Sequence, residues 1–265
     1  MDFSTIKMVV TDMDGTLLNE KHEVSTEFFE LFQKMQQRGI RFVAASGRQY
    51  PSMVSKLEPI KGQMSFISEN GALIVENDTV IHSRGIEMNQ VTDLLEYLGD
   101  ESAIESIICC AEKAYSTSKN QDFHQLLHEY YSSHVLIDHP GQVRHEPLKI
   151  ALYHPISGEQ HIYPSVQHYS KHLQVKISGD YWVDLSHKDA NKGVALTRLL
   201  EQYQIKPDEI IVFGDYLNDL EMLQLTPNSV AMGNAHEQVK KLAKYQTESH
   251  QNLGVEKILS QLLTF

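Results

Sequence analysis

The stretch that decides the fold is "KMVVTDMDGTLLNEK", Lys7 to Lys21. Its short apolar and β-branched run, Lys7–Thr11, is typical of a fully buried strand. Two aspartates, Asp12 and Asp14, follow directly and are one residue apart. Alternate residues of an extended segment point to the same side, so both carboxyl groups can face one crevice, and Gly15 then lets the chain turn away. The pattern predicts a strand that ends in a polar site.

A strand–helix rhythm continues on both sides of a central segment. Ser25 is a typical helix N-cap, and "IRFVAASGR" (40–48) predicts a second buried strand that runs into a Ser-Gly turn. Near the C-terminus, residues 191–205 predict a helix, 209–215 a strand, and "AHEQVKKLAKY" (235–245) another helix. Strands that alternate with helices predict a parallel sheet with crossover helices.

The central segment differs from the flanking segments in composition and in the pattern of apolar residues. Between about Arg84 and Asp189, tyrosine and histidine accumulate, and "QVKISGDYWVDLS" (174–186) alternates between apolar and polar residues. Such a change is expected where a second domain is inserted into a first. We therefore predict that residues 84–189 are an insertion between two parts of a core, residues 1–83 and 190–265.

Composition and charge exclude several classes of protein. The 265 residues carry a formal net charge of −12, and an acidic surface repels nucleic acid and anionic membranes. The two cysteines, Cys109 and Cys110, are adjacent and rarely meet disulfide geometry. The start, "MDFSTIKMVV", has no targeting pattern, and no stretch has the roughly 18 apolar residues that span a bilayer. We expect a soluble, cytoplasmic protein; the sequence carries no signal for its oligomeric state.

Polar groups gather at four candidate strand ends, which meet at one edge of an open parallel sheet. A turn or a helix cap would explain any one of them alone. Together, four carboxylates in one crevice would repel one another, and oxygen ligands without matching His or Cys favour Mg²⁺ as the balancing cation. A lysine and hydrogen-bond donors beside them predict a phosphoryl-group site in which the first aspartate can act as nucleophile. The strand-end residues are Asp12 and Asp14, Ser46 and Gly47, residues 191–193 with Lys192, and Asp215 and Asp219.

Six motifs carry a family resemblance. They are "DMDGTLL" (12–18), "AASGR" (44–48), "ENGALI" (69–74), "NKGVAL" (191–196), "GDYLNDLEML" (214–223) and "AMGNAHEQVK" (231–240). With them the sequence resembles the haloacid dehalogenase-like (HAD) superfamily, specifically its Cof-type phosphatase branch. The resemblance covers residues 6–83 and 190–265, and the insertion matches in position and length. One departure is "HQNLGVEKIL" (250–259), where relatives usually have an acidic residue before Gly-Val; we expect it to affect a loop near the site.

The resemblance implies an α/β fold, with a Rossmann-like three-layer core around a parallel sheet and an inserted α/β cap domain. It also implies Mg²⁺ dependence and an aspartyl-phosphate intermediate. By the same resemblance, Asp12 is the nucleophile and Asp14 the general acid/base. The metal ligands would be Asp12, Asp14 through its backbone carbonyl, and Asp215, with Asp219 in a supporting role. The phosphate-binding residues would be Met13, Ser46, Gly47, Lys192 and Asn218.

Three functional classes stay open. The leading one is a Mg²⁺-dependent phosphomonoesterase that acts on small phosphorylated metabolites such as sugar phosphates. A phosphotransferase or phosphomutase would use the same motifs. A binding protein without activity is less favoured, because every polar group needed for turnover is present. A cap of this size should close over the site, which disfavours a macromolecular substrate.

Two patterns in the insertion have alternative explanations. The histidine pairs His124/His128 and His168/His172 have zinc-ligand spacing, but no glutamate completes an HExxH motif and no cysteine pair lies near them in the sequence, so solvent-facing side chains are favoured. Aromatic residues of the insertion could line a sugar pocket or form the core of the cap. These residues are Tyr115, Tyr130, Tyr131, Tyr153 and Trp182.

Overall fold

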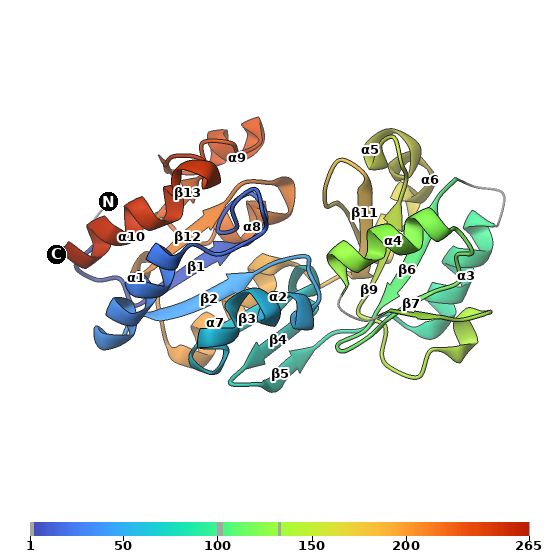
Figure 1. Ribbon diagram of the computed structural model, residues 1–265, viewed down its shortest axis with the longest axis horizontal. Helices are drawn as coiled ribbons and strands as arrows, with labels where there is room; N and C mark the ends of the chain where they lie inside the picture. Colours follow the sequence, from blue (N-terminus) through green and yellow to red (C-terminus); the bar gives the residue numbers. More distant parts are fainter. Residues whose placement is uncertain (1–2, 100–102, 132–133, 265) are drawn as a thin grey trace.

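Figure 1 shows a computed structural model of the chain, which describes residues 3–99, 103–131 and 134–264. Within these residues the strands form an eight-stranded sheet, in the order β14-β13-β12-β1-β2-β3-β4-β5, and a six-stranded sheet, in the order β10-β11-β9-β6-β7-β8. Strands β14 to β3 of the larger sheet are parallel, whereas β4 and β5 are antiparallel to their neighbours. Its strands are β1 (Met8–Asp12), β2 (Arg41–Ala45), β3 (Ser65–Ser68), β4 (Leu73–Glu76), β5 (Thr79–Ser83), β12 (Ile210–Gly214), β13 (Ser229–Ala231) and β14 (Tyr245–Gln246).

Strand β1 lies in the middle of the larger sheet. All five of its residues are buried, as its apolar sequence predicts for a strand covered on both faces. It pairs in parallel with β2 on one side and β12 on the other. The carboxyl ends of these three strands therefore meet at one edge, where Asp12 ends β1.

Helices cover both faces of this sheet (Figure 1). Ser25 caps α1 (Thr26–Gln37) by accepting a hydrogen bond from Phe28 N, as predicted. Helix α1 packs against α10 (Gly254–Thr264) on the near face, and α7 (Lys192–Tyr203) packs against α8 (Leu220–Leu223) behind the sheet. The predicted α/β fold with a helix-covered parallel sheet is confirmed. The remaining α-helices of this part are α2 (Tyr50–Leu57) and α9 (Glu237–Leu242).

The helix predicted over residues 235–245 is shorter than expected. Helix α9 ends at Leu242, and the backbone of Ala243 is extended. Tyr245 and Gln246 instead form β14, which pairs in parallel with β13 at the edge of the sheet. Sheet pairing thus overrides the local helical preference of the stretch.

The six-stranded sheet is antiparallel except for the parallel pair β7–β8. Its two faces bury separate apolar clusters, one under α3 and one under α4. Successive residues of β6 alternate between them, since Ile107 and Cys109 pack with α4 whereas Ile108 packs with α3. Cys109 and Cys110 are both buried and free. The elements are β6 (Glu105–Cys109), β7 (Ala114–Ser116), β8 (His134–Leu136), β9 (Lys149–Tyr153), β10 (Leu173–Ile177), β11 (Trp182–His187), α3 (Met88–Leu98), α4 (Gln121–Tyr130), α5 (Gly158–His161) and α6 (Tyr163–Val166).

Two chain segments connect the sheets, and they lie close together. The first follows β5 and the second follows β11, and Arg84 Nη2 lies 3.7 Å from Asp189 Oδ2 across them. We therefore propose the division into a core, residues 1–83 and 190–265, and a cap, residues 84–189. No helix in the described part of the chain is long and apolar enough to cross a membrane.

Candidate active site

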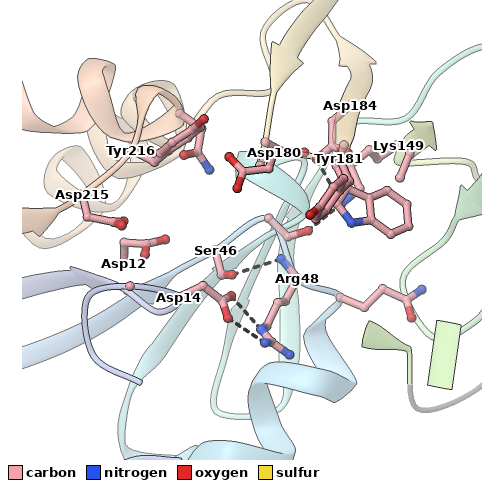
Figure 2. A pocket seen from close by; sticks show the side chains of 18 of the residues that line it. Asp12, Asp14, Ser46, Arg48, Lys149, Asp180, Tyr181, Asp184, Asp215 and Tyr216 are labelled. Atoms are coloured by element: carbon pink, nitrogen blue, oxygen red, sulfur yellow. Dashed lines mark hydrogen bonds and ion pairs between the residues drawn. The ribbon is translucent and has the colours of Figure 1, made fainter. Parts of the chain in front are cut away.

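A cavity of about 400 Å³ lies at the carboxyl end of β1, between the two sheets. Figure 2 shows its side chains. The larger sheet contributes most of the predicted site residues to its wall. They are Asp12, Asp14, Ser46, Gly47, Asp215 and Asn218.

Lys192 lies beneath this wall and is completely buried. Its Nζ donates hydrogen bonds to Asp12 Oδ1 at 2.6 Å and to Asp219 Oδ1 at 2.7 Å. Burial alone would lower the pKa of Lys192, but the two carboxylates outweigh it and raise the pKa above its ordinary value. The side chain of Asn191 caps α7 and so fixes the start of the helix that carries the lysine. Lys192 is therefore a permanent positive charge against Asp12.

Three carboxylates cluster around this lysine. Oxygen atoms of Asp12, Asp215 and Asp219 lie within 4.8 Å of one another. Burial, reinforced by the neighbouring carboxylates, raises the pKa of Asp12 to about 7 and that of Asp215 to about 9. One lysine leaves the cluster short of positive charge, and all of the donors are oxygen atoms. The set fits a hard divalent cation such as Mg²⁺.

Asp219 is completely buried, and both of its oxygen atoms accept hydrogen bonds. Oδ1 accepts from Lys192, and Oδ2 accepts from the amides of Asp215 at 2.9 Å and Tyr216 at 3.2 Å. Asp219 thereby fixes the backbone that carries Asp215. This geometry fits the supporting role expected for it.

The turn after Asp14 requires a glycine. Gly15 has a φ of +77°, and a Cβ added there would overlap the Asp215 carboxylate. The neighbouring carbonyl of Met13 accepts hydrogen bonds from the amides of Thr16, Leu17 and Leu18. The turn therefore brings the β1 end and Asp215 into direct contact.

Asp14 points away from the carboxylate cluster and pairs with Arg48 (Figure 2). Arg48 Nε lies 2.7 Å from Asp14 Oδ2, and Nη2 lies 2.6 Å from Oδ1. His22 Nδ1 is 3.4 Å from the same Oδ1. Burial favours the neutral acid, but the hydrogen bonds from His22 and Arg48 reverse the effect and lower the pKa of Asp14 well below its usual range. Sequence reasoning missed Arg48, although it directly follows Ser46 and Gly47 in "AASGR".

The candidate phosphate-binding groups face the same cavity. Ser46 Oγ accepts a hydrogen bond from Arg48 N at 3.1 Å, which leaves its hydroxyl hydrogen free to donate. Asn218 Nδ2 donates to Asn70 Oδ1 at 3.0 Å. The loop at residues 250–253 belongs to the segment where the sequence differs from the family pattern. It lies next to Asn234, whose Nδ2 is 3.4 Å from Asp215 Oδ2.

The opposite wall comes from the six-stranded sheet and the hairpin between β10 and β11. Tyr131 and Trp182 line the cavity, as the pocket interpretation of the aromatic residues predicts, together with Asp180 and Tyr181. Tyr131 and Trp182 also pack in the apolar cluster under α4, so they take part in both the cavity wall and the core. Tyr115 and Tyr153 pack in the apolar clusters without lining the cavity, and the side chain of Tyr130 lies outside the described residues. Among the described residues, Asp12, Asp215 and Asp219 form the one group with metal-ligand geometry, and no histidine belongs to it.

Known proteins are similar to this chain over nearly its whole length. A phosphatase of Escherichia coli, "5-amino-6-(5-phospho-D-ribitylamino)uracil phosphatase YbjI", is 30% identical and covers 98% of this chain and 97% of its own. "Phosphatase YwpJ" of Bacillus subtilis is 29% identical and covers 97% and 100%. A solved haloacid dehalogenase-like hydrolase of Bacillus subtilis superposes with a TM-score of 0.86 at 26% identity, covering 97% and 100%.

The profile of one family matches residues 9–259, and its description is "haloacid dehalogenase-like hydrolase". The match spans both parts of the larger sheet and the whole six-stranded sheet. The chain therefore belongs to the haloacid dehalogenase-like hydrolases, which confirms the family and the enzyme class, phosphatase, that the motifs predict.

Proposed function

We propose that this enzyme is a Mg²⁺-dependent phosphomonoesterase that hydrolyses small phosphorylated metabolites through an aspartyl-phosphate on Asp12. The observation that carries the proposal is the position of Asp12. It ends the central strand, contacts the buried charge of Lys192 at 2.6 Å, and lines the cavity beside Ser46 and Asn218. A phosphoryl group in this cavity would meet a nucleophile and its charge-stabilising donors together.

In the first step an Asp12 carboxylate oxygen attacks phosphorus, and the bond from phosphorus to the leaving oxygen breaks. The leaving oxygen takes a proton from Asp14. Because the contact with Arg48 keeps this carboxyl group ionised, Asp14 must first leave Arg48 and take up a proton from solvent. In the second step Asp14 accepts a proton from water, the water oxygen attacks phosphorus, and the Asp12 carboxylate is released with inorganic phosphate. Ser46 holds a phosphoryl oxygen throughout, and Lys192 would join it by turning one N–H from its buried contacts with Asp12 and Asp219 toward the cavity.

Asp12, Asp215 and the backbone carbonyl of Asp14 are the proposed Mg²⁺ ligands. When bound, Mg²⁺ would neutralise charge on the phosphoryl group and on the clustered carboxylates. The raised pKa values of Asp12 and Asp215 support this assignment, because an added cation would restore both groups to their ionised form.

We propose sugar phosphates as the main substrate class, since the exposed carboxylate of Asp180 in the cavity wall can accept hydrogen bonds from hydroxyl groups. The aromatic wall of Tyr181 and Trp182 supports a second candidate, a phosphate ester with a polyhydroxy chain and a planar ring. The Escherichia coli relative is named for such a compound. The two buried free cysteines are consistent with a reducing compartment, and we propose that the enzyme acts in the cytoplasm.

The test is phosphate release from a panel of sugar phosphates and ring-bearing phosphate esters, with Mg²⁺ and with EDTA. We expect release that EDTA abolishes and Mg²⁺ restores; full activity in the chelated sample would contradict the proposed metal. The same assay with added glycerol separates hydrolysis from phosphotransfer. Phosphorylated glycerol in excess over inorganic phosphate would favour the phosphotransferase alternative.

A further inference from the structure

A buried polar network joins the two sheets beside the cavity. Lys149 comes from β9 and Asp184 from β11, both in the six-stranded sheet, whereas Glu69 and Asn70 lie between β3 and β4 of the larger sheet. All four side chains are almost completely buried. Lys149 Nζ lies 2.8 Å from Glu69 Oε2 and 3.4 Å from Asp184 Oδ2. Figure 2 shows Lys149 and Asp184 at the wall opposite Ser46.

The first arm of the network ends on the loop that carries Ser46 and Gly47. Three successive carbonyl groups of this loop are engaged. Asn70 N donates to Ser46 O at 3.0 Å, and Glu69 N donates to Arg48 O at 3.1 Å. The carbonyl between them, Gly47 O, accepts from Lys149 Nζ at 2.5 Å. Of these three carbonyl groups, the larger sheet thus holds two and the six-stranded sheet holds the third.

The second arm ends on Asn218. Asp184 Oδ2 accepts a hydrogen bond from Asn70 Nδ2 at 2.7 Å, which fixes the orientation of the Asn70 amide. Asn70 Oδ1 in turn accepts from Asn218 Nδ2 at 3.0 Å. The carboxylate of Asp184 therefore sets, through one intermediate side chain, the direction in which the Asn218 amide faces the cavity.

The charges of the network explain why it forms as a unit. Burial raises the pKa of Glu69, and Lys149 offsets part of that rise. The two carboxylates raise the pKa of Lys149 against the effect of burial. Each charge is tolerated in the interior because the others are present. The lysine and Asp184 can take these positions only when the six-stranded sheet is docked.

We propose that Lys149 and Asp184 are positioning residues of the phosphate site, which act through Gly47 and through Asn70 and Asn218. The phosphate site is then complete only with the six-stranded sheet in place, so binding of the phosphoryl group and docking of this sheet favour each other. This inference rests on the proposed function of the cavity as a phosphate site.

The test is the affinity of the full-length protein for inorganic phosphate, measured by calorimetry in the presence of Mg²⁺. Lys149→Met removes the donor to Gly47 O and should weaken phosphate binding about tenfold, the size of one charged hydrogen bond. The matched control is Lys176→Met. Lys176 pairs with Glu221 between β10 and α8, so it also links the two sheets, but it does not line the cavity. This variant should bind phosphate within about twofold of the wild type.

Equal weakening by Lys176→Met and Lys149→Met would overturn the proposal, because general sheet docking would then explain both. Unchanged affinity in Lys149→Met would overturn it as well. Should that variant fail to fold, the double variant Lys149→Met with Glu69→Gln also removes the buried Glu69 charge that Lys149 no longer pairs. The double variant should show the same weakening of phosphate binding. Asp184→Asn keeps an acceptor for Asn70 and should bind phosphate nearly as the wild type does, whereas Asp184→Ala should not. Equal loss in both would contradict positioning by the hydrogen bond.

The proposed function is judged separately, by hydrolysis with the wild-type enzyme. A wild type that binds phosphate but hydrolyses no ester would contradict the proposed function and leave the phosphate affinities to decide on Lys149 and Asp184. Suppose instead that the wild type hydrolyses esters and that Lys149→Met binds phosphate as tightly as the wild type. That result would contradict the positioning role alone.

Discussion

Asp12 and Asp14 are separated by one residue and have opposite electrostatic surroundings. Asp12 is buried beside Lys192 and two further carboxylates, and its pKa rises to about 7. Asp14 is paired with Arg48, and its pKa falls well below the usual range. The proposed roles need the reverse of both shifts, because Asp12 must be ionised to attack and Asp14 must be protonated to act as an acid. A cation bound beside Asp12, and release of Asp14 from Arg48, would supply these changes.

The residue-scale prediction for Asp12 follows from its proposed covalent role. Asp12→Asn replaces the attacking carboxylate and removes one of the two counter-charges of Lys192, so kcat should fall about a thousandfold or more. Asp14→Asn leaves the attacking group in place and should slow turnover by ~10²–10⁴ through lost acid/base catalysis. The measurement is steady-state hydrolysis, with acid quenching and peptide mass spectrometry to locate the phosphoryl group. A phosphoryl group on Ser46, or near-normal turnover in Asp12→Asn, would show that the roles are wrong.

A second prediction concerns Arg48. Arg48→Met removes the ion pair that lowers the pKa of Asp14, so that pKa should rise. Asp14 must be ionised to accept a proton from water, and the acidic limb of the kcat profile should therefore move to higher pH. The measurement is kcat from pH 4 to 8 in both proteins. Arg41→Met, at the opposite end of β2, is the control and should keep the wild-type profile; an unshifted profile in Arg48→Met would contradict the assignment.

At the scale of elements, α1 and α10 are joined by a buried carboxyl group. Ser25 caps α1 and donates to Glu256 Oε1 at 2.6 Å, and Glu256 lies in the first turn of α10. Burial raises the pKa of Glu256, and the hydrogen bond from Ser25 offsets only part of the rise. Below its unfolded-state pKa the group is neutral in both states. As the pH rises through the folded-state pKa, the native protein loses the stability associated with the neutral form.

Glu256→Gln removes this ionisation and keeps an acceptor for Ser25. The free energy of unfolding of the variant should therefore increase relative to that of the wild type as the pH rises from 4 to 7. The two free energies should differ least at low pH. The measurement is urea unfolding at several pH values. Glu256→Ala, which loses the hydrogen bond and buried volume, should be less stable than Glu256→Gln at every pH, by about 1–3 kcal/mol. A constant difference between wild type and Glu256→Gln would show that Glu256 does not titrate as described.

The elements that could be predicted are those with local signals. Strand β1 begins with three apolar residues and is buried along its whole length, and α1 has a cap, an apolar stripe and Gly39 just past its end. Strand β14 could not be predicted, because two residues become a strand only through pairing with β13. The site divides in the same way. Asp12 and Asp14 follow from a motif, whereas the contacts of Lys149 depend on how β9 meets a loop a hundred residues earlier.

On the scale of the whole molecule, we propose that one wall of the cavity carries the catalytic groups and that the opposite wall contacts the rest of the substrate. The larger sheet supplies the carboxylates, and the six-stranded sheet supplies Tyr131, Tyr181 and Trp182. We propose that the residues 84–189 act as a cap that determines which esters are accepted. The sequence offers Tyr131 and Trp182 as candidates for a pocket but leaves packing in the core equally open, since nothing in a strand pattern shows which side faces a neighbouring domain.

Replacing residues 86–188 with a short Gly/Ser linker tests this division. The linker can be short because the two connections are close, with Arg84 and Asp189 in contact. The shortened protein should still hydrolyse p-nitrophenyl phosphate, with weaker phosphate binding, and should lose its preference among metabolites. The measurement is the spread of kcat/KM over the substrate panel. Trp182→Phe in the full-length protein is the control and should preserve most of that spread; an unchanged preference after the replacement would contradict a selective cap.

The order of strands along the chain has a consequence for synthesis on the ribosome. Every strand of the six-stranded sheet lies between residues 105 and 187, so this sheet can close as soon as that stretch has emerged. Strand β1 is made first, yet one of its two partners is β12, where Met8 pairs with Ile210. Until β12 has been synthesised, the nascent chain carries an apolar, unpaired strand edge. Such an edge can pair with other chains and cause aggregation. A truncation near residue 190 would therefore give a finished cap attached to an aggregation-prone half core.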